Sequence, residues 1–176
     1  MKGECCSPMV PTTDLTFAQL QEYFGSSDLS ELQRSIQEVD CPEYSYELVK
    51  RSVSMSLDRS DRERELISRM LSELYPDTLS SNMIGKGFER LFELSDELEK
   101  DVPTCRDCIS KFLARAVLDE VLPPSFLSDI VVRNLGGSIV DHAMRMLSRE
   151  HGSTLLEHAW GPGDGRPAAE LKVRDR

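Results

Sequence analysis

The chain has 176 residues, with 21 Lys or Arg against 31 Asp or Glu, so its formal net charge is -10 and its pI about 4.8. This length suits one domain with tails. Such an acidic chain repels phosphate backbones, which disfavours direct nucleic-acid binding, whereas a basic protein surface would be attracted to it. No apolar run approaches the roughly 18 residues that a membrane span needs, so we expect a soluble protein.

The five cysteines are an odd set without the spacing of a disulfide framework, and the N-terminus has no apolar signal segment. This favours a reducing compartment, the cytoplasm, with the nucleus as a second location. Cys105 and Cys108 form a C-x-x-C pair, but no second pair or suitably spaced His completes a zinc site. Both fall on an apolar helical stripe, where Cys acts as a small hydrophobe. We therefore expect neither metal nor cofactor.

Residues 1–13 contain breakers and no apolar period, and are predicted to be a flexible tail. A first helix follows, ended by Gly25. The spacing of Asp28 and Glu31 resembles a capping box and predicts the start of a second helix. The apolar stripes of this predicted hairpin are Phe17, Leu20, Tyr23 and Phe24 in the first helix, and Leu29, Leu32 and Ile36 in the second.

The next two predicted helices have clearer signals. The third begins after Pro42, and the fourth begins at the capping box of Ser60 and Glu63 and stops before Pro76. Apolar residues recur every three to four positions, which places them on one helical face. They are Tyr46, Val49, Val53 and Leu57 in the third helix, and Leu66, Ile67, Met70, Leu71 and Leu74 in the fourth.

A fifth helix is predicted around Ile84–Phe92, and a sixth with Pro103 in its first turn and Phe112 on its apolar face. Weaker helices are predicted near 125–135 and 138–149, and no segment has the alternation of a strand. We therefore predict an all-α, HEAT-like stack of antiparallel helical hairpins. Its single domain would span 14–150, with its core in 16–127, and 151–176 would be a linker or tail.

The sequence offers no catalytic machinery. None of His142, His151 and His158 pairs with a plausible nucleophile. The run Gly85–Gly87 lacks the preceding strand of a phosphate loop, so small residues that allow close helix packing are the better interpretation. The chain is predicted not to be an enzyme.

The acidic run Asp96–Pro103 is predicted to be a connection into the sixth helix. Carboxylates there could stabilise the N-terminus of that helix through its dipole, or they could form a binding site. Position in the sequence does not decide between the two.

Five segments, taken together, carry a family resemblance. They are Leu48–Asp58, Gly87–Leu91, Asp101–Pro103, Phe112–Val117 and Leu122–Pro124. Together they resemble the MA-three domain of the programmed-cell-death-four family, especially its plant members. The resemblance covers roughly Thr16 to Leu127. Trp160–Gly163 is similar to the linker that leads to a second copy of the domain in that family.

The resemblance implies binding to initiation factor four A, the DEAD-box helicase of translation initiation, in competition with RNA and the initiation scaffold protein. It thereby implies repression of cap-dependent translation. In the family, two acidic residues four apart contact the helicase, and they correspond to Glu97 and Asp101, with Pro103 shaping the turn. Family members usually carry two or more such domains, so a segment of a longer protein or a truncated relative is expected. The alternative is a helical scaffold or adaptor of the translation machinery that does not inhibit the helicase.

Overall fold

The computed structural model describes residues 12–39, 41 and 45–161. Within these residues the chain forms helices and no strand, which confirms the all-α prediction. None of the described helices has the length and apolarity needed to cross a membrane. The helices are α1 (Thr12–Ser26), α2 (Leu29–Val39), α3 (Ser45–Ser56), α4 (Asp61–Leu74), α5 (Ser81–Asp101), α6 (Cys105–Leu118), α7 (Ser125–Ser128), α8 (Ile130–Gly136), α9 (Ser138–Ser148) and α10 (Gly152–Glu157).

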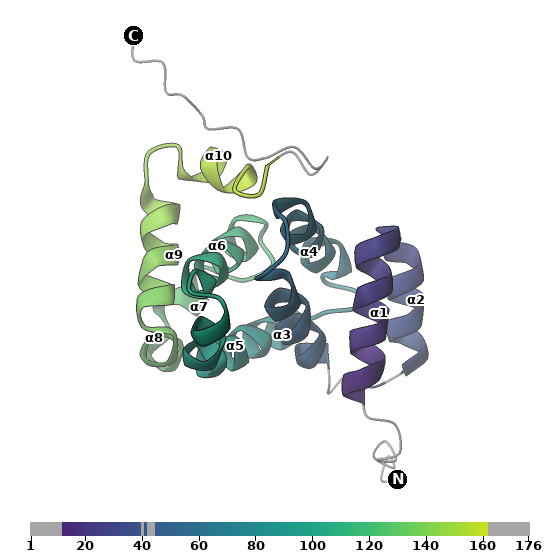
Figure 1. The fold of residues 1–176 in the computed structure, drawn as a ribbon. Coiled ribbons are helices and arrows are strands. Elements are labelled where there is room, and N and C mark those ends of the chain that lie inside the picture. The colour runs from purple at the N-terminus through teal and green to yellow at the C-terminus, as the bar shows by residue number, and fades with distance from the viewer. Residues whose placement is uncertain (1–11, 40, 42–44, 162–176) are drawn as a thin grey trace, which may run out of the picture.

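The helices form a row of antiparallel pairs (Figure 1). The α1–α2 hairpin lies at one end, α8 and α9 at the other, and α3 to α6 between them. Helix α3 packs along α5, and α6 packs along α9, while α10 lies against α6 and α9. Each pair buries its apolar stripe against the next pair, which is the predicted HEAT-like arrangement.

Side-chain caps start several helices. The carboxylate of Glu63 accepts hydrogen bonds from the backbone N–H and the hydroxyl of Ser60, as the capping-box spacing predicted. The Asp28 carboxylate accepts from the N–H of Glu31 at the start of α2. The helix predicted near 125–135 is split in two, because Asp129 leaves the helical conformation and caps α8 through the N–H groups of Val131 and Val132.

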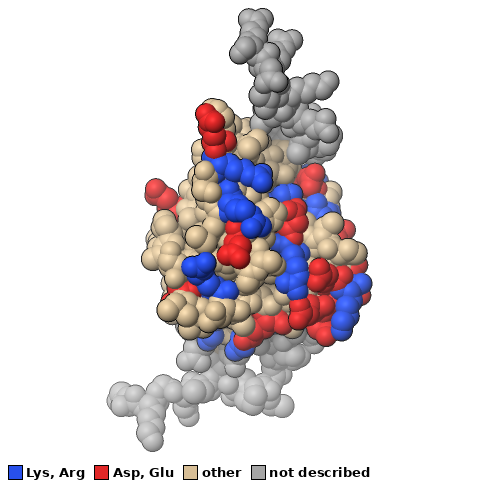
Figure 2. Space-filling view, turned by 90° about the vertical axis from the view of Figure 1, so that its left-hand side faces the viewer, with Lys and Arg blue, Asp and Glu red and all other residues tan. Residues whose placement is uncertain are grey.

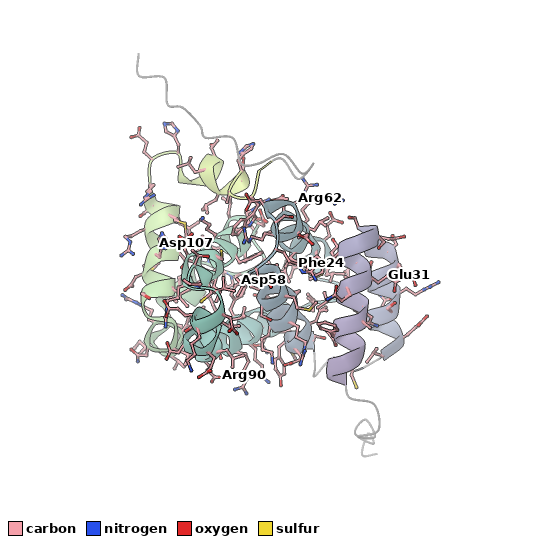
Figure 3. The ribbon with its side chains drawn as sticks, viewed as in Figure 1. Phe24, Glu31, Asp58, Arg62, Arg90 and Asp107 are labelled. Carbon is pink, nitrogen blue, oxygen red and sulfur yellow. The ribbon has the colours of Figure 1, made fainter. Side chains whose placement is uncertain are left out.

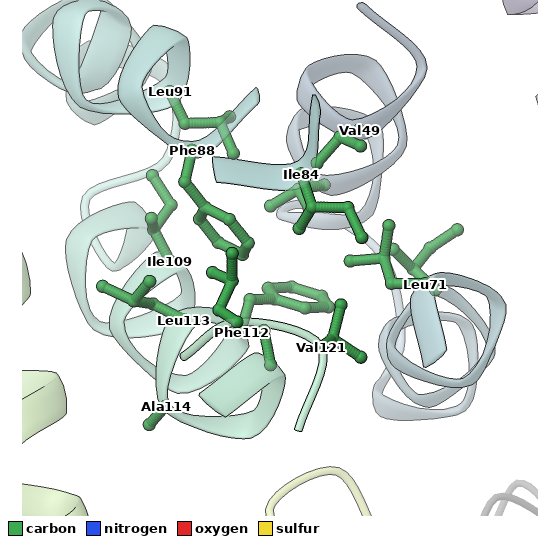
Figure 4. Close-up of a cluster of buried hydrophobic side chains, with 14 of the residues drawn as sticks. Val49, Leu71, Ile84, Phe88, Leu91, Ile109, Phe112, Leu113, Ala114 and Val121 are labelled. Atoms are coloured by element: carbon green, nitrogen blue, oxygen red, sulfur yellow. The ribbon is translucent and has the colours of Figure 1, made fainter. Parts of the chain in front are cut away.

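The core lies where α3, α4, α5 and α6 meet (Figure 4). Its largest side chains include Phe88 and Phe112, both almost fully buried. Gly87 allows α5 to approach α3 closely, since a Cβ at this position would lie 2.6 Å from the Cβ of Val49. The interpretation of the Gly85–Gly87 run as a close-packing site is thereby confirmed.

Cys105 and Cys108 are free, buried thiols on the inner face of α6, as the apolar stripe predicted. Burial raises the pKa of both thiols, which keeps them protonated and unreactive at neutral pH. Among the residues that the structure describes, no group of three His, Cys, Asp or Glu side chains is arranged to hold a metal ion.

The linker predicted from residue 151 is wrong for residues 152–161. They form α10 and a following turn, and the side chains of Leu156 and Trp160 are buried. A single tryptophan among glycines and prolines has no helical period, yet it offers enough apolar area to dock on neighbouring helices. The rest of the predicted linker, 162–176, lies outside the described residues, as does the predicted tail up to residue 11. Thr12 and Thr13 already belong to α1.

Candidate functional site

Glu97 and Asp101 lie on the last two turns of α5. The prediction of a connection beginning at Asp96 is therefore wrong for residues 96–101, which are helical. The helix continues because Ser95 and Leu98 extend its inner face. It ends at Val102, whose extended conformation (φ -127, ψ 94) is the one favoured before a proline. Pro103 lies exposed in the turn that follows, and α6 begins two residues later at Cys105 rather than at the proline.

This placement argues against one of the two interpretations of the acidic run, the stabilisation of a helix start. The C-terminal end of a helix carries a partial negative charge. An exposed carboxylate there therefore lowers stability by about 0.3–1 kcal/mol. Glu97 and Asp101 occupy that end of α5. They do not stabilise a helix start, and the dipole interpretation is wrong for both. A binding role does not share this difficulty, since exposed charges can be kept for a partner at a small cost in stability.

Most carboxylates at this edge are paired within the chain. The Nζ atom of Lys100 lies 2.8 Å from Glu97, and both side chains are about 70% exposed. Arg106 on α6 bonds to Glu99 at 2.9 Å and also contacts Asp96. Among the described residues, the carboxylate of Asp101 has no ion pair or hydrogen bond. Asp101 therefore offers an unoccupied negative charge to an approaching cation.

Asp101 also lines a surface groove of about 460 Å³ between α1, the turn from α3 to α4, and the end of α5. A second acidic residue, Asp58, lies in the α3–α4 turn (Figure 3) and also lines the groove, and its carboxylate too has no partner within the described residues. The groove thus has two free carboxylates at positions 43 residues apart in the sequence.

The remaining walls of the groove are largely apolar. The apolar lining residues are Phe17, Met55, Leu57, Leu98 and Val102, and the uncharged polar ones are Gln21 and Ser54. Phe17 was predicted to lie on the buried stripe of its helix, but it is 46% exposed and faces the groove. Long alkyl stems can pack on such walls while a charged head reaches a carboxylate. The groove therefore suits a Lys or Arg side chain from a partner.

The groove also holds one cation of its own. Arg59 lines it, but its guanidinium bonds to Glu63 and Gln21 and lies 4.2 Å from the ring centroid of Phe24. These contacts hold the positive charge of Arg59 toward α1 and α4. Asp58 and Asp101 therefore remain available.

The predicted site residues are only partly brought together. Asp101 lines the groove, Glu97 lies one turn earlier on the same exposed face of α5, and Pro103 does not line the groove. Sequence reasoning missed Asp58 and Phe17. No local signal marks Asp58, because the α3–α4 turn and the end of α5 become neighbours only when the hairpins stack.

Charge is unevenly distributed over the surface. On the face that presents α8 and α9, large areas carry no charge, and the charged side chains gather toward one side (Figure 2). The two free carboxylates lie elsewhere, at the groove between α1, the α3–α4 turn and the end of α5.

A stack of helical hairpins with an exposed acidic edge defines a protein-interaction module. The chain belongs to the MA3 domain family, because residues 12–123, more than half of its length, match the MA3 domain. It is 37% identical over 150 residues to MA3 domain-containing translation regulatory factor 1 of Arabidopsis thaliana, covering 83% of this chain and 21% of that protein. The similarity to factor 3 of the same plant is 36% over 160 residues, or 88% of this chain and 23% of that protein.

Programmed cell death protein 4 of Gallus gallus is a more distant relative, 26% identical over 159 residues, which cover 89% of this chain and 34% of that protein. The chain thus spans about a quarter of the plant relatives and about a third of the avian one. The plant relatives are named as translation regulatory factors and the avian one as a programmed cell death protein.

Proposed function

We propose that this domain binds initiation factor four A, the DEAD-box helicase of translation initiation, and inhibits or regulates cap-dependent translation. The observation that carries the proposal is the pair of free carboxylates, Asp58 and Asp101, at the edge of an apolar groove. Glu97 lies on the same face of α5, and the family resemblance assigns helicase contact to Glu97 and Asp101. The helicase partner implies a cytoplasmic location, with the nucleus as a second one.

The proposed mechanism is electrostatic competition. A helicase surface that binds RNA phosphates carries Lys and Arg, and these side chains would meet the carboxylates of the domain instead. Because Glu97 and Asp101 are exposed, each contact contributes modestly, and much of its effect is on the association rate and its salt dependence. The apolar groove walls would supply the part of the affinity that salt does not screen.

The strength of inhibition depends on what else the full-length protein carries. The matched region makes up only 23% and 21% of two of the plant relatives. A second copy of the domain on the same chain would raise the local concentration of binding sites and so tighten the complex without any new contact. A single domain is expected to bind more weakly than such a pair.

The test is the double substitution Glu97→Ala with Asp101→Ala, measured by calorimetry against the isolated helicase. We expect binding to weaken by about tenfold, equivalent to ~1.4 kcal/mol, and to become less sensitive to salt. The variant should remain helical and equally stable or slightly more stable, because negative charge is removed from the C-terminal end of α5.

A matched control removes the same charge elsewhere. Glu31 and Glu38 lie on α2, where both pair with Arg34. Changing both to Ala alters the net charge equally, so it separates local contact from overall attraction. If the α5 variant binds as tightly as the wild type at low salt, only the scaffold or adaptor alternative is left. If both double variants weaken binding equally, the effect is one of net charge.

A further inference from the structure

We infer that the C-terminal strap, defined as residues 152–161, positions the binding groove through Trp160 and Arg64. Trp160 would act as a positioning residue that never touches the partner. This inference rests on the proposed function for its binding measurement, but its structural part can be tested without any partner.

The strap is docked firmly on the body of the domain. The Trp160 side chain is 2% exposed, and its ring centroid lies 5.0 Å from that of Phe112 on α6. Arg115, also on α6, donates to the backbone oxygens of Leu156 and Glu157 at 3.2 and 3.3 Å. The carbonyl of Leu156 also accepts from the backbone N–H of Ala159 at 3.1 Å, so Arg115 adds a second bond at the C-terminal end of α10. The strap is thus held at both its helix and its tryptophan.

Arg64 connects the strap with the groove. Its guanidinium carbon lies 5.5 Å from the Trp160 ring centroid. From the same guanidinium group, Nη2 donates to the backbone oxygen of Leu57 at 2.8 Å, and Nη1 bonds to Asp61 at 2.8 Å. Leu57 directly precedes Asp58, so Arg64 braces the turn that carries one of the two free carboxylates of the groove.

Trp160 limits the conformational freedom of the Arg64 side chain, which keeps the guanidinium bonded to the turn. The Arg64 side chain is 18% exposed, with the indole covering part of it. Without the indole, the guanidinium would regain rotamer freedom, and water would compete for its bond to Leu57. The turn would then sample more conformations, and the Asp58 carboxylate would be held less well for a partner cation.

Two buried donors at the contact between the strap and α4 lack a hydrogen-bond partner. Trp160 Nε1 and Arg64 Nε are both buried without a hydrogen-bond partner. Unsatisfied buried donors oppose docking, while burial of the indole favours it. Loss of the indole would therefore leave the order of the α3–α4 turn dependent on Arg64 alone.

The first experiment needs no partner. Hydrogen exchange of residues 56–61 is compared between the wild type and Trp160→Ala, and exchange in the variant should be at least about fivefold faster. Leu127→Ala, which truncates a buried side chain on α7, and Leu155→Ala, which truncates an exposed side chain on the strap, serve as controls. Equal exchange at 56–61 in the wild type and Trp160→Ala would overturn the inference.

The second experiment measures binding to the helicase. Trp160→Ala should weaken it by about 3- to 10-fold, and combining this change with Asp58→Ala should add little to the loss caused by Asp58→Ala alone, since coupled residues are not additive. If the loss of affinity in the double variant equals the product of the two single-variant losses, Trp160 does not act through the turn that carries Asp58. A wild-type chain that fails to bind would refute the proposed function, while the hydrogen-exchange result would still decide the inference.

A third variant separates the arginine from the strap. Arg64→Met should weaken binding while Trp160, the only tryptophan of the chain, stays protected from a fluorescence quencher such as acrylamide. If Arg64→Met binds as tightly as the wild type while the indole stays docked, Arg64 does not link Trp160 to the groove, and the inference is overturned.

Discussion

Replacing Arg115 with Met is expected to lower the free energy of unfolding by about 3–5 kcal/mol, because it removes the buried cation that Glu65 and Asp119 share. The Arg115 side chain is 11% exposed and lies 3.3 Å from Glu65, which is 4% exposed, and 3.1 Å from Asp119. The arginine also holds the strap. Urea denaturation followed by circular dichroism would measure the loss.

Arg69 supplies a matched control. It bonds to the same carboxylate, that of Glu65, at 3.0 Å, but its own side chain is 54% exposed. Arg69→Met should cost less than about 1 kcal/mol, as exposed ion pairs usually do. Equal losses for the two variants would contradict the assignment of Arg115 as a buried structural cation.

The loss at Arg115 should depend on pH. Burial raises the pKa of Asp119, while Arg115 acts to lower it. When folding raises the pKa of an acid, the ionised acid lowers the stability of the folded state at any pH above the folded pKa. This loss of stability disappears below the unfolded pKa, about 3.9, where the acid is protonated in both states. Without Arg115 the pKa of Asp119 rises further. The difference between wild type and variant should therefore be largest at neutral pH and shrink as the pH falls toward 4, whereas a constant difference would point to lost packing alone.

Leu71→Ala is expected to destabilise the domain by about 2–5 kcal/mol, the range for buried large-to-small substitutions. Leu71 is almost fully buried on α4 and faces the cluster that includes Ile84 and Phe112 (Figure 4). The cavity left by the substitution lies at the centre of the stack, where neighbouring helices cannot easily collapse. Chemical denaturation would give the loss directly.

Leu135→Ala is the corresponding surface change, since Leu135 is one of the exposed large apolar residues. It should cost less than about 1 kcal/mol. An unfolding midpoint of Leu71→Ala equal to that of the wild type would mean that the apolar face of α4 does not support the core.

The sequence predicts the central helices well because their signals are local. Ser60 and Glu63 mark a helix start by a hydrogen-bond pattern three residues long, and Leu71 belongs to a stripe with the helical period. The end of α5 was missed because an acidic run resembles a connection, although no helix breaker precedes Pro103. Periodicity would have carried the helix through Ser95 and Leu98.

The groove and the strap could not be predicted in the same way, because they depend on which helices become neighbours. Asp58 and Asp101 meet only in the folded stack, and the exposure of Phe17 depends on the space left beside α1. Trp160 is a single aromatic residue outside any period. Its burial follows from a surface that α4 and α6 create together, which no local pattern encodes.

The position of α1 gives the groove a thermal weak point. The α1–α2 hairpin is the terminal unit of the row and packs mainly against α3. Terminal units of a stacked array have one neighbour instead of two, so they open first on warming. Because Phe17 of α1 forms one wall of the groove, mild heat would dismantle the groove while α3 to α6 remain folded, and recognition would fail at a lower temperature than the fold itself.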